Sequence, residues 1–224
     1  MSRRTKHYFL ALLPILFSCS FVSAQNGKKV SYGILVDNTG SMRSQFNQVT
    51  ALGKSVVKHV YQNGPVSIFH FSSQGDRRNP IAMATSGIES QDPDALETYI
   101  DYLYVLAGQT TLLDAIGSMA KELTARNSAD KGRETSPVVI VISDGEDRVS
   151  HLKEKDLINE LKASGTRVYA LGLVQELSGS KRDKAKDLLR NVTSETGGRV
   201  VFSDSRISDV DKLVTELLTP PTQK

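Results

Sequence analysis

Two apolar stretches of this chain each lead to an aspartate, and they restrict the fold more than any other feature. Residues 34–36 (ILV) precede Asp37, and residues 137–143 (PVVIVIS) precede Asp144. Short, continuously apolar runs are typical of strands buried on both faces of a parallel sheet. A carboxylate directly after such a strand lies at the carboxyl end of the sheet, where open α/β sheets bind their ligands. We therefore expect both aspartates at one binding edge.

The rest of the chain alternates strand and helix patterns. Strands are predicted at residues 30–37, 66–71, 81–84, 137–143, 166–173 and 198–202. Helices are predicted at residues 44–61, from Asp92-Pro93, from Thr111 to about residue 123, and at 152–163, 182–192 and 207–218. The polar turn at residues 72–79 suggests a hairpin between the second and third strands. We expect an α/β fold, doubly wound and Rossmann-like, with a mostly parallel sheet, helices on both faces and one short antiparallel edge strand.

Hydroxyl side chains follow the first aspartate at alternate positions. Thr39 and Ser41 come two and four residues after Asp37, and Gly40 between them is expected to permit a tight turn that brings the three side chains together. Oxygen ligands of this type suit a hard cation such as Mg²⁺ better than zinc, which prefers nitrogen and sulfur. The segment therefore predicts one arm of a metal site.

Three segments together resemble the von Willebrand factor A domain. That family carries a metal-ion-dependent adhesion site (MIDAS), built from an Asp-x-Ser-x-Ser motif, a separate threonine and a separate aspartate. The matching segments are residues 37–41 (DNTGS), 108–116 (GQTTLLDAI) and 139–145 (VIVISDG). The resemblance covers about residues 30–218 and is similar to bacterial exported members. It departs from the family motif at Thr39, where a serine is usual, but threonine keeps the hydroxyl.

The resemblance implies a ligand set and a way of binding. The metal ligands would be Asp37, Thr39, Ser41, Thr110 and Asp144, and the cation Mg²⁺ or Mn²⁺. The resemblance implies hydroxyl ligands bound directly, with Thr110 direct in one state and through water in another. The aspartates would act partly through water. An Asp or Glu of a protein partner would complete the shell, so the chain would be a binding or adhesion module and not an enzyme.

The first residues have the pattern of a secretory signal peptide. A basic start is followed by an apolar stretch, and small residues precede a cleavage position after Ala24. The apolar stretch is short for a membrane span. Cys19, the only cysteine, offers an alternative as a lipid anchor in a loose lipobox. We expect residues 1–24 to be removed, residues 25–218 to form one domain, residues 219–224 to be a frayed tail, and the protein to be periplasmic or secreted.

Charge argues against nucleic acid as a partner. Three of the 28 Lys and Arg lie in residues 1–24, which hold no Asp or Glu, so 25 basic residues face 25 acidic ones in the remainder. A formally neutral chain gives no electrostatic reason to bind nucleic acid or an anionic membrane.

Two other functions fit parts of the sequence. A phosphotransferase of the haloacid-dehalogenase type also places an aspartate after its first strand, but it needs a second carboxylate two residues later, where this chain has Thr39. A metal-free structural interaction module is the third reading. Nearby, Thr111 and Asp114 have the spacing of a helix capping box, and Asp147 is expected at the rim without a ligand role.

Overall fold

The computed structural model describes residues 29–72, 84–129, 135–203 and 209–219. These residues form a six-stranded sheet of order β3-β2-β1-β4-β5-β6, in which only the β2–β3 pair is antiparallel. The strands are β1 (Lys29–Asp37), β2 (Val66–Phe71), β3 (Ala84–Ser90), β4 (Thr135–Ser143), β5 (Arg167–Gly172) and β6 (Val200–Phe202). The prediction of a mostly parallel sheet with one antiparallel edge strand is confirmed.

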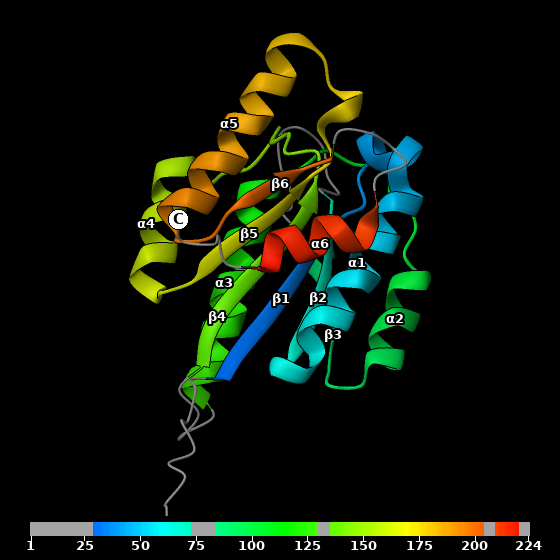
Figure 1. Ribbon diagram of the computed structural model, residues 1–224. Coiled ribbons are helices and arrows are strands. Elements are labelled where there is room, and N and C mark those ends of the chain that lie inside the picture. The colour runs from blue at the N-terminus through cyan, green and yellow to red at the C-terminus, as the bar shows by residue number, and fades with distance from the viewer. Residues whose placement is uncertain (1–28, 73–83, 130–134, 204–208, 220–224) are drawn as a thin grey trace, which may run out of the picture.

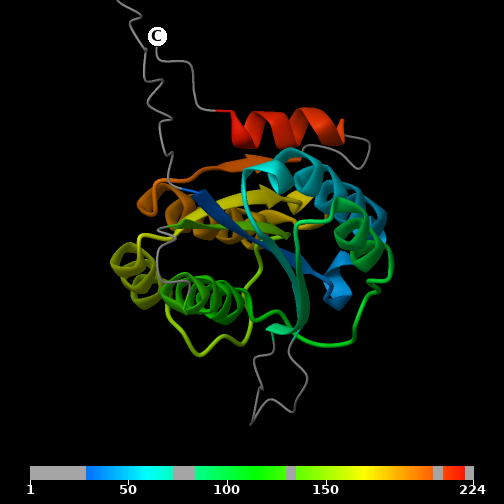
Figure 2. The ribbon, with the colours of Figure 1, turned by 90° about the horizontal axis from the view of Figure 1, so that it is seen from below.

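Helices cover both faces of this sheet (Figures 1 and 2). One face carries α1 (Phe46–Val60), α2 (Pro93–Asp101) and α6 (Val210–Leu218), and the other carries α3 (Leu112–Ala129), α4 (Glu154–Ser164) and α5 (Gly179–Glu195). Short 3-10 helices are η1 (Gly40–Gln45), η2 (Tyr61–Asn63) and η3 (Val174–Glu176). The arrangement is the doubly wound one that the sequence predicted.

The central strands contribute to the core on both sides. In β1, Ile34 and Val36 pack toward α1 and α6, whereas Leu35 packs toward α3, and none of the three is exposed. In β4, Ile140 and Val141 divide between the same two cores. Burying each such side chain contributes about 1.5–3 kcal/mol. The continuous apolar runs are thus explained by burial on two faces.

The strand order reverses between β1 and β4. From β1 the chain passes outward through β2 and β3, then returns to place β4 on the other side of β1. The two strands are parallel neighbours with Val36 opposite Ile142, so the residues that follow them leave the sheet side by side. Ligands of open α/β sheets bind at such a reversal, and the adjacency of the two aspartate-bearing strands satisfies the condition under which their carboxylates converge.

The third strand lies later in the chain than predicted. It spans Ala84–Ser90, whereas the sequence pattern favoured residues 81–84, of which 81–83 lie outside the described residues. Its segment ATSGIES contains a single large apolar residue, Ile88, because an edge strand has one half-exposed face and little need for apolar side chains. The predicted signal peptide, Cys19 and residues 220–224 also lie outside the described residues. None of the described helices is long and apolar enough to cross a membrane.

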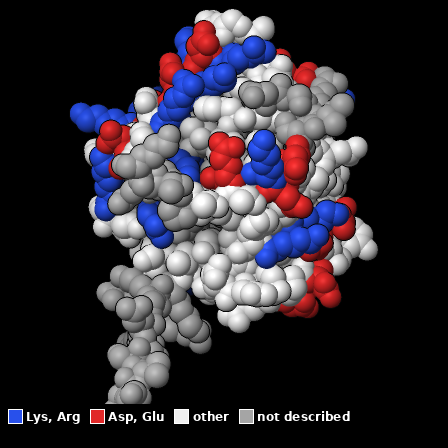
Figure 3. All heavy atoms as spheres, viewed as in Figure 1, with Lys and Arg blue, Asp and Glu red and all other residues white. Residues whose placement is uncertain are grey.

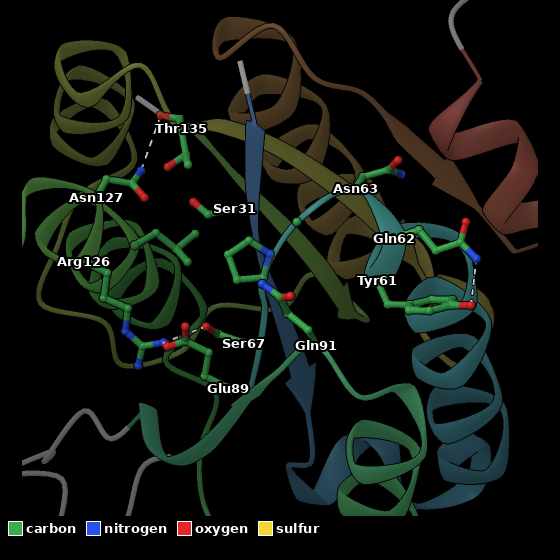
Figure 4. A pocket seen from close by; sticks show the side chains of 13 residues that line it. Ser31, Tyr61, Gln62, Asn63, Ser67, Glu89, Gln91, Arg126, Asn127 and Thr135 are labelled. Atoms are coloured by element: carbon green, nitrogen blue, oxygen red, sulfur yellow. Dashed lines mark hydrogen bonds and ion pairs between the residues drawn. The ribbon is translucent and has the colours of Figure 1, made fainter. Parts of the chain in front are cut away.

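The amino edge of the sheet, away from the two aspartates, contains a cavity of about 140 Å³ between β1, β2 and α3 (Figure 4). Beside it, Arg126 of α3 forms an ion pair with Glu89 of β3 and donates a hydrogen bond of 2.9 Å to Ser67 Oγ of β2. These contacts hold the carboxyl-terminal part of α3 against the β2–β3 hairpin. The helix is thereby anchored at the end opposite to the aspartates.

Close packing of α3 against β1 yields a prediction at Gly33. A Cβ at this position would lie 2.5 Å from Met119 Sδ and 3.1 Å from Leu123 Cδ1. We expect Gly33→Ala to lower the free energy of unfolding by about 1–3 kcal/mol, measured by urea denaturation, because the helix or Met119 must shift. Gly40→Ala is the control, since its Cβ would meet nothing within 4 Å. Equal stability of the two variants would contradict this account of the packing.

Candidate functional site

The fold brings together all five side chains that the sequence singled out. Thr39 Oγ1 lies 2.7 Å from Asp37 Oδ1, 3.1 Å from Ser41 Oγ and 3.4 Å from Thr110 Oγ1. Ser41 also hydrogen-bonds Asp144. All but Ser41 are at most 2% exposed. Two carboxylates and three hydroxyls therefore converge at the carboxyl edge of the sheet, although their role as metal ligands remains a prediction.

Both oxygens of Asp37 are held by hydrogen bonds. Oδ1 accepts from the backbone N–H of Thr39 at 3.0 Å and from its hydroxyl, and Oδ2 accepts from Ser143 Oγ at 2.6 Å. Ser143 in turn accepts from the backbone N–H of Gly145 at 3.0 Å. Gly145 has φ of +80°, a conformation that L side chains rarely adopt, and it turns the chain away directly after Asp144. Ser143 thus links the two aspartate-bearing strand ends.

Gly40, by contrast, lies in the tight turn without a left-handed conformation. It opens η1, and its φ is not among the positive values found at other described glycines. The turn that brings Thr39 and Ser41 together is therefore a 3-10 turn accessible to other residues. The expected tight turn is present, and it does not depend on a positive φ at Gly40.

The loop that carries Thr110 is fixed by the loop after β4. The Thr110 carbonyl accepts backbone hydrogen bonds from Arg148 at 3.0 Å and from Val149 at 3.3 Å. The hydroxyl of Thr110 faces Thr39, whereas the hydroxyl of the neighbouring Thr111 is buried with no partner among the described residues. The geometry therefore places Thr110, and not Thr111, among the converging hydroxyls.

The predicted capping box at the start of α3 was wrong. The Thr111 hydroxyl makes no capping bond in the described structure, and the Asp114 carboxylate accepts instead from the backbone of residues 151 and 152 at 2.9 Å each. The helix end is capped from elsewhere, because Leu113 donates its N–H to Asp147 Oδ1 at 3.3 Å. Asp147 is separated from Leu113 by 34 positions, so no local sequence signal could reveal this cap.

Burial and mutual repulsion dominate the electrostatics of the site. Asp37 is completely buried, and this burial together with the Asp144 charge raises its pKa to about 7. Burial also raises the pKa of Asp144. In the described part of the chain, neither carboxylate has a Lys, Arg or His nitrogen within 4.0 Å. The nearby guanidinium of Arg148 is ion-paired with Glu146.

Basic side chains gather elsewhere on the surface. Figure 3 shows a band of Lys and Arg along α5, interspersed with acidic residues. Lys186 and Arg190 of this helix lie 5.4 and 5.2 Å from the ring centre of Phe202. These cations cover the end of β6, as expected for a solvated helix face, and do not neutralise the aspartate pair.

The donor set fits a hard divalent cation. No three His, Cys, Asp or Glu side chains cluster as a metal site in the part of the chain that the structure describes. The candidate site differs from such clusters in that it combines two carboxylates with three hydroxyls. Two desolvated carboxylates that form no ion pair of their own are stabilised by protonation or by a bound cation, and oxygen-only donors favour Mg²⁺ or a similar ion.

Comparison with known proteins identifies the family. The von Willebrand factor type A domain family model matches residues 33–216, most of the chain. The chain belongs to the von Willebrand factor type A family. This match confirms the resemblance drawn from the three sequence segments. No protein with a curated description matched the chain.

Solved structures show the same fold. The pilus adhesin SpaC from Lactobacillus rhamnosus GG is 15% identical, with a TM-score of 0.61, over 86% of this chain and 30% of the adhesin. The manganese-loaded TRAP protein of Plasmodium vivax is 15% identical, with a TM-score of 0.56, over 86% of this chain and 73% of TRAP. The mussel byssus protein PTMP1, with a zinc-occupied MIDAS motif, is 15% identical, with a TM-score of 0.61, over 85% of this chain and 47% of PTMP1. This chain thus spans less than half of the adhesin and of the byssus protein.

The raised pKa of Asp37 predicts a pH dependence of stability. A carboxyl group whose pKa is higher in the folded state, about 7 against an ordinary 3.8, stabilises the fold at low pH. This contribution is lost as the pH rises from about 4 to about 7. We expect the metal-free protein to lose more unfolding free energy over this range than Asp37→Asn, measured by urea denaturation in EDTA. Burial lowers the pKa of His70, which increases the free energy of unfolding as the pH rises. This opposite effect is the same in the unmodified protein and in Asp37→Asn. Parallel pH profiles would contradict the prediction.

Proposed function

We propose that this chain is an exported protein-binding module that uses a MIDAS-type divalent cation. Asp37, Thr39, Ser41, Thr110 and Asp144 would hold Mg²⁺ or Mn²⁺, and an Asp or Glu of a protein partner would complete the coordination. The observation that carries the proposal is the pair of buried carboxylates, which converge with three hydroxyls and form no ion pair within 4.0 Å in the described structure.

The charged and the neutral side chains of the site would have different roles in holding a cation. Asp37 and Asp144 supply negative charge, whereas the three hydroxyls supply neutral oxygens, so that a bound divalent cation would remain able to attract a further carboxylate. When bound, the cation supplies a Lewis-acidic position for that carboxylate. Ser143 and the backbone N–H of Thr39 keep Asp37 oriented through hydrogen bonds of 2.6 and 3.0 Å.

The same geometry favours binding over catalysis. A phosphotransferase would need a second carboxylate at the position of Thr39 to act as general acid and base. Thr39 instead donates its hydroxyl proton to Asp37 Oδ1 at 2.7 Å, which orients that carboxylate. The proposed module therefore recognises a partner without breaking a bond, as is general for interaction and adhesion modules of this family.

Export is supported by sequence and by the kinds of protein that share the fold. The leader pattern of residues 1–24 motivates it. SpaC is a pilus adhesin, PTMP1 is a byssus protein, and TRAP and PTMP1 are described with manganese and with a zinc-occupied MIDAS motif. For this chain, the metal, the acidic partner and a periplasmic or secreted location are part of the proposal.

Metal titration tests the proposal. We expect isothermal titration of the purified, EDTA-stripped protein with Mg²⁺ or Mn²⁺ to give about one ion per chain. Asp144→Asn should weaken metal binding at least about tenfold, because it removes a charged ligand. Removal of a group that only orients a ligand already lowers metal affinity about 10–100-fold in many sites. Asp183→Asn on the exposed face of α5 is the matched control and should bind as the unmodified chain does.

Circular dichroism of each variant distinguishes loss of the site from loss of the fold. Asp144→Asn should retain the helix and strand signal of the unmodified protein, because Asp144 follows the sheet and is not part of its core. Failure of the unmodified protein to bind either ion, or equal binding by Asp144→Asn, would overturn the proposed metal site.

A further inference from the structure

The loop after β4 carries an arginine at the rim of the candidate metal site. Arg148 follows Asp144 in this loop, and its backbone N–H donates to the Thr110 carbonyl at 3.0 Å. The backbone of Arg148 is therefore fixed beside one of the proposed hydroxyl ligands. Its side chain is 48% exposed, so the guanidinium is accessible from solvent at this edge of the sheet.

Glu146 restrains the guanidinium. Glu146 Oε2 accepts hydrogen bonds from Arg148 Nε at 3.1 Å and from Arg148 Nη2. The backbone N–H of Glu146 donates to Asp144 Oδ1 at 2.9 Å, so both members of the pair are tied to the metal site through their backbone. Nη1 of Arg148 makes no hydrogen bond in the part of the chain that the structure describes. The guanidinium thus keeps a donor group for a further ligand.

Arg148 and the two buried carboxylates lie within electrostatic reach of one another. The hydrogen bond with Glu146 is the largest cause of a raised pKa at Arg148, and the charges of Asp144 and Asp37 raise this pKa further. Within the described residues, however, Arg148 forms its ion pair with Glu146 and not with either aspartate. An ion pair within one loop, with one member half-exposed, contributes little to stability. Stability therefore does not explain why an arginine is held at this place.

The position has opposite effects on a cation and on a carboxylate. A guanidinium near the site repels a divalent cation, whereas it attracts a carboxylate that lies between the two positive groups. A carboxylate has two oxygens, and an open coordination position takes one of them. The other oxygen is then free to accept a hydrogen bond, and a guanidinium is the side chain whose planar donors match carboxylate geometry.

Resting on the proposed function, we infer that Arg148 is a partner-binding residue of the metal site. One oxygen of the partner's carboxylate binds the cation, and the other accepts a hydrogen bond from the Arg148 guanidinium. Glu146 keeps that guanidinium from pairing with Asp144 in place of the cation. Because two positive groups share one carboxylate, the cation and the partner strengthen each other's binding.

Titration with metal alone provides the first measurement. We expect isothermal titration of EDTA-stripped Arg148→Gln with Mn²⁺ to show about threefold tighter binding than the unmodified protein, because a repelling charge is removed. Arg148→Lys keeps the charge and should bind Mn²⁺ as the unmodified protein does. Arg190→Gln is the matched control, since Arg190 is also exposed and pairs with Asp187 of its own helix. It should leave the affinity unchanged.

A peptide with a single carboxylate provides the second measurement. A phage library of random peptides around one fixed aspartate would be selected on the unmodified protein in Mg²⁺ and eluted with EDTA. An amidated peptide with no other acidic residue would then be measured by fluorescence polarisation at saturating Mg²⁺. Arg148→Gln should bind it about tenfold more weakly, because a charge-assisted hydrogen bond is lost. Arg148→Lys should lose less, and Arg190→Gln should lose nothing.

The two affinities together distinguish partner binding from a structural role. Weaker peptide binding by Arg148→Gln, with metal binding undiminished, supports the inference. Unchanged peptide binding, or equal weakening of metal and peptide binding, would overturn it and leave the metal-dependent function standing. Failure of the unmodified protein to bind a cation, or to yield any EDTA-eluted peptide, would overturn the proposed function as well.

Discussion

Repulsion between the carboxylates of Asp37 and Asp144 is the constraint on which the rest of the site depends. The two aspartates follow neighbouring parallel strands at the reversal of strand order, so the topology itself brings their charges together. Both are almost fully buried, which removes the solvent that would otherwise screen them. Two buried carboxylates so close together lower the stability of the fold, which indicates that their negative charge serves a function.

Much of the surrounding structure serves to hold neutral oxygens near this pair. The first motif is tied to the segment after α2 through Asn38, and the Thr110 loop is tied to the loop after β4 through backbone hydrogen bonds. Asp147 of that same loop caps α3, whose other end is anchored to the hairpin by Arg126. Three segments distant in sequence are thus interlocked at one edge of the sheet, largely through backbone groups.

The sequence predicted the features that depend on burial and on chain order. The apolar runs before Asp37 and Asp144 are continuous because both faces of these strands are covered, and alternation of strands with helices requires parallel crossovers. The convergence of Thr110 with the first motif could be predicted only by resemblance to a family, because nothing local relates residues 71 positions apart.

Errors arose where local patterns competed with contacts from distant segments. Thr111 and Asp114 have the spacing of a capping box. In the structure Asp147 accepts the hydrogen bond at the start of α3, and Asp114 accepts backbone N–H groups of residues 151 and 152. The sequence pattern predicts edge strand β3 too early because its segment ATSGIES has one large apolar residue and lacks a strong apolar pattern. Hydrogen bonds between segments distant in the chain cannot be predicted from the local sequence.

The adjacency of β1 and β4 also has a consequence for how the protein folds. The Ser143–Asp37 hydrogen bond joins residues 106 positions apart, so the site comes into existence only when the two central strands have paired. Closing so long a loop is slow, and it occurs late compared with the formation of helices. A cation bound there would therefore act on the completed sheet, prolonging the lifetime of the native state while leaving the rate of folding almost unchanged.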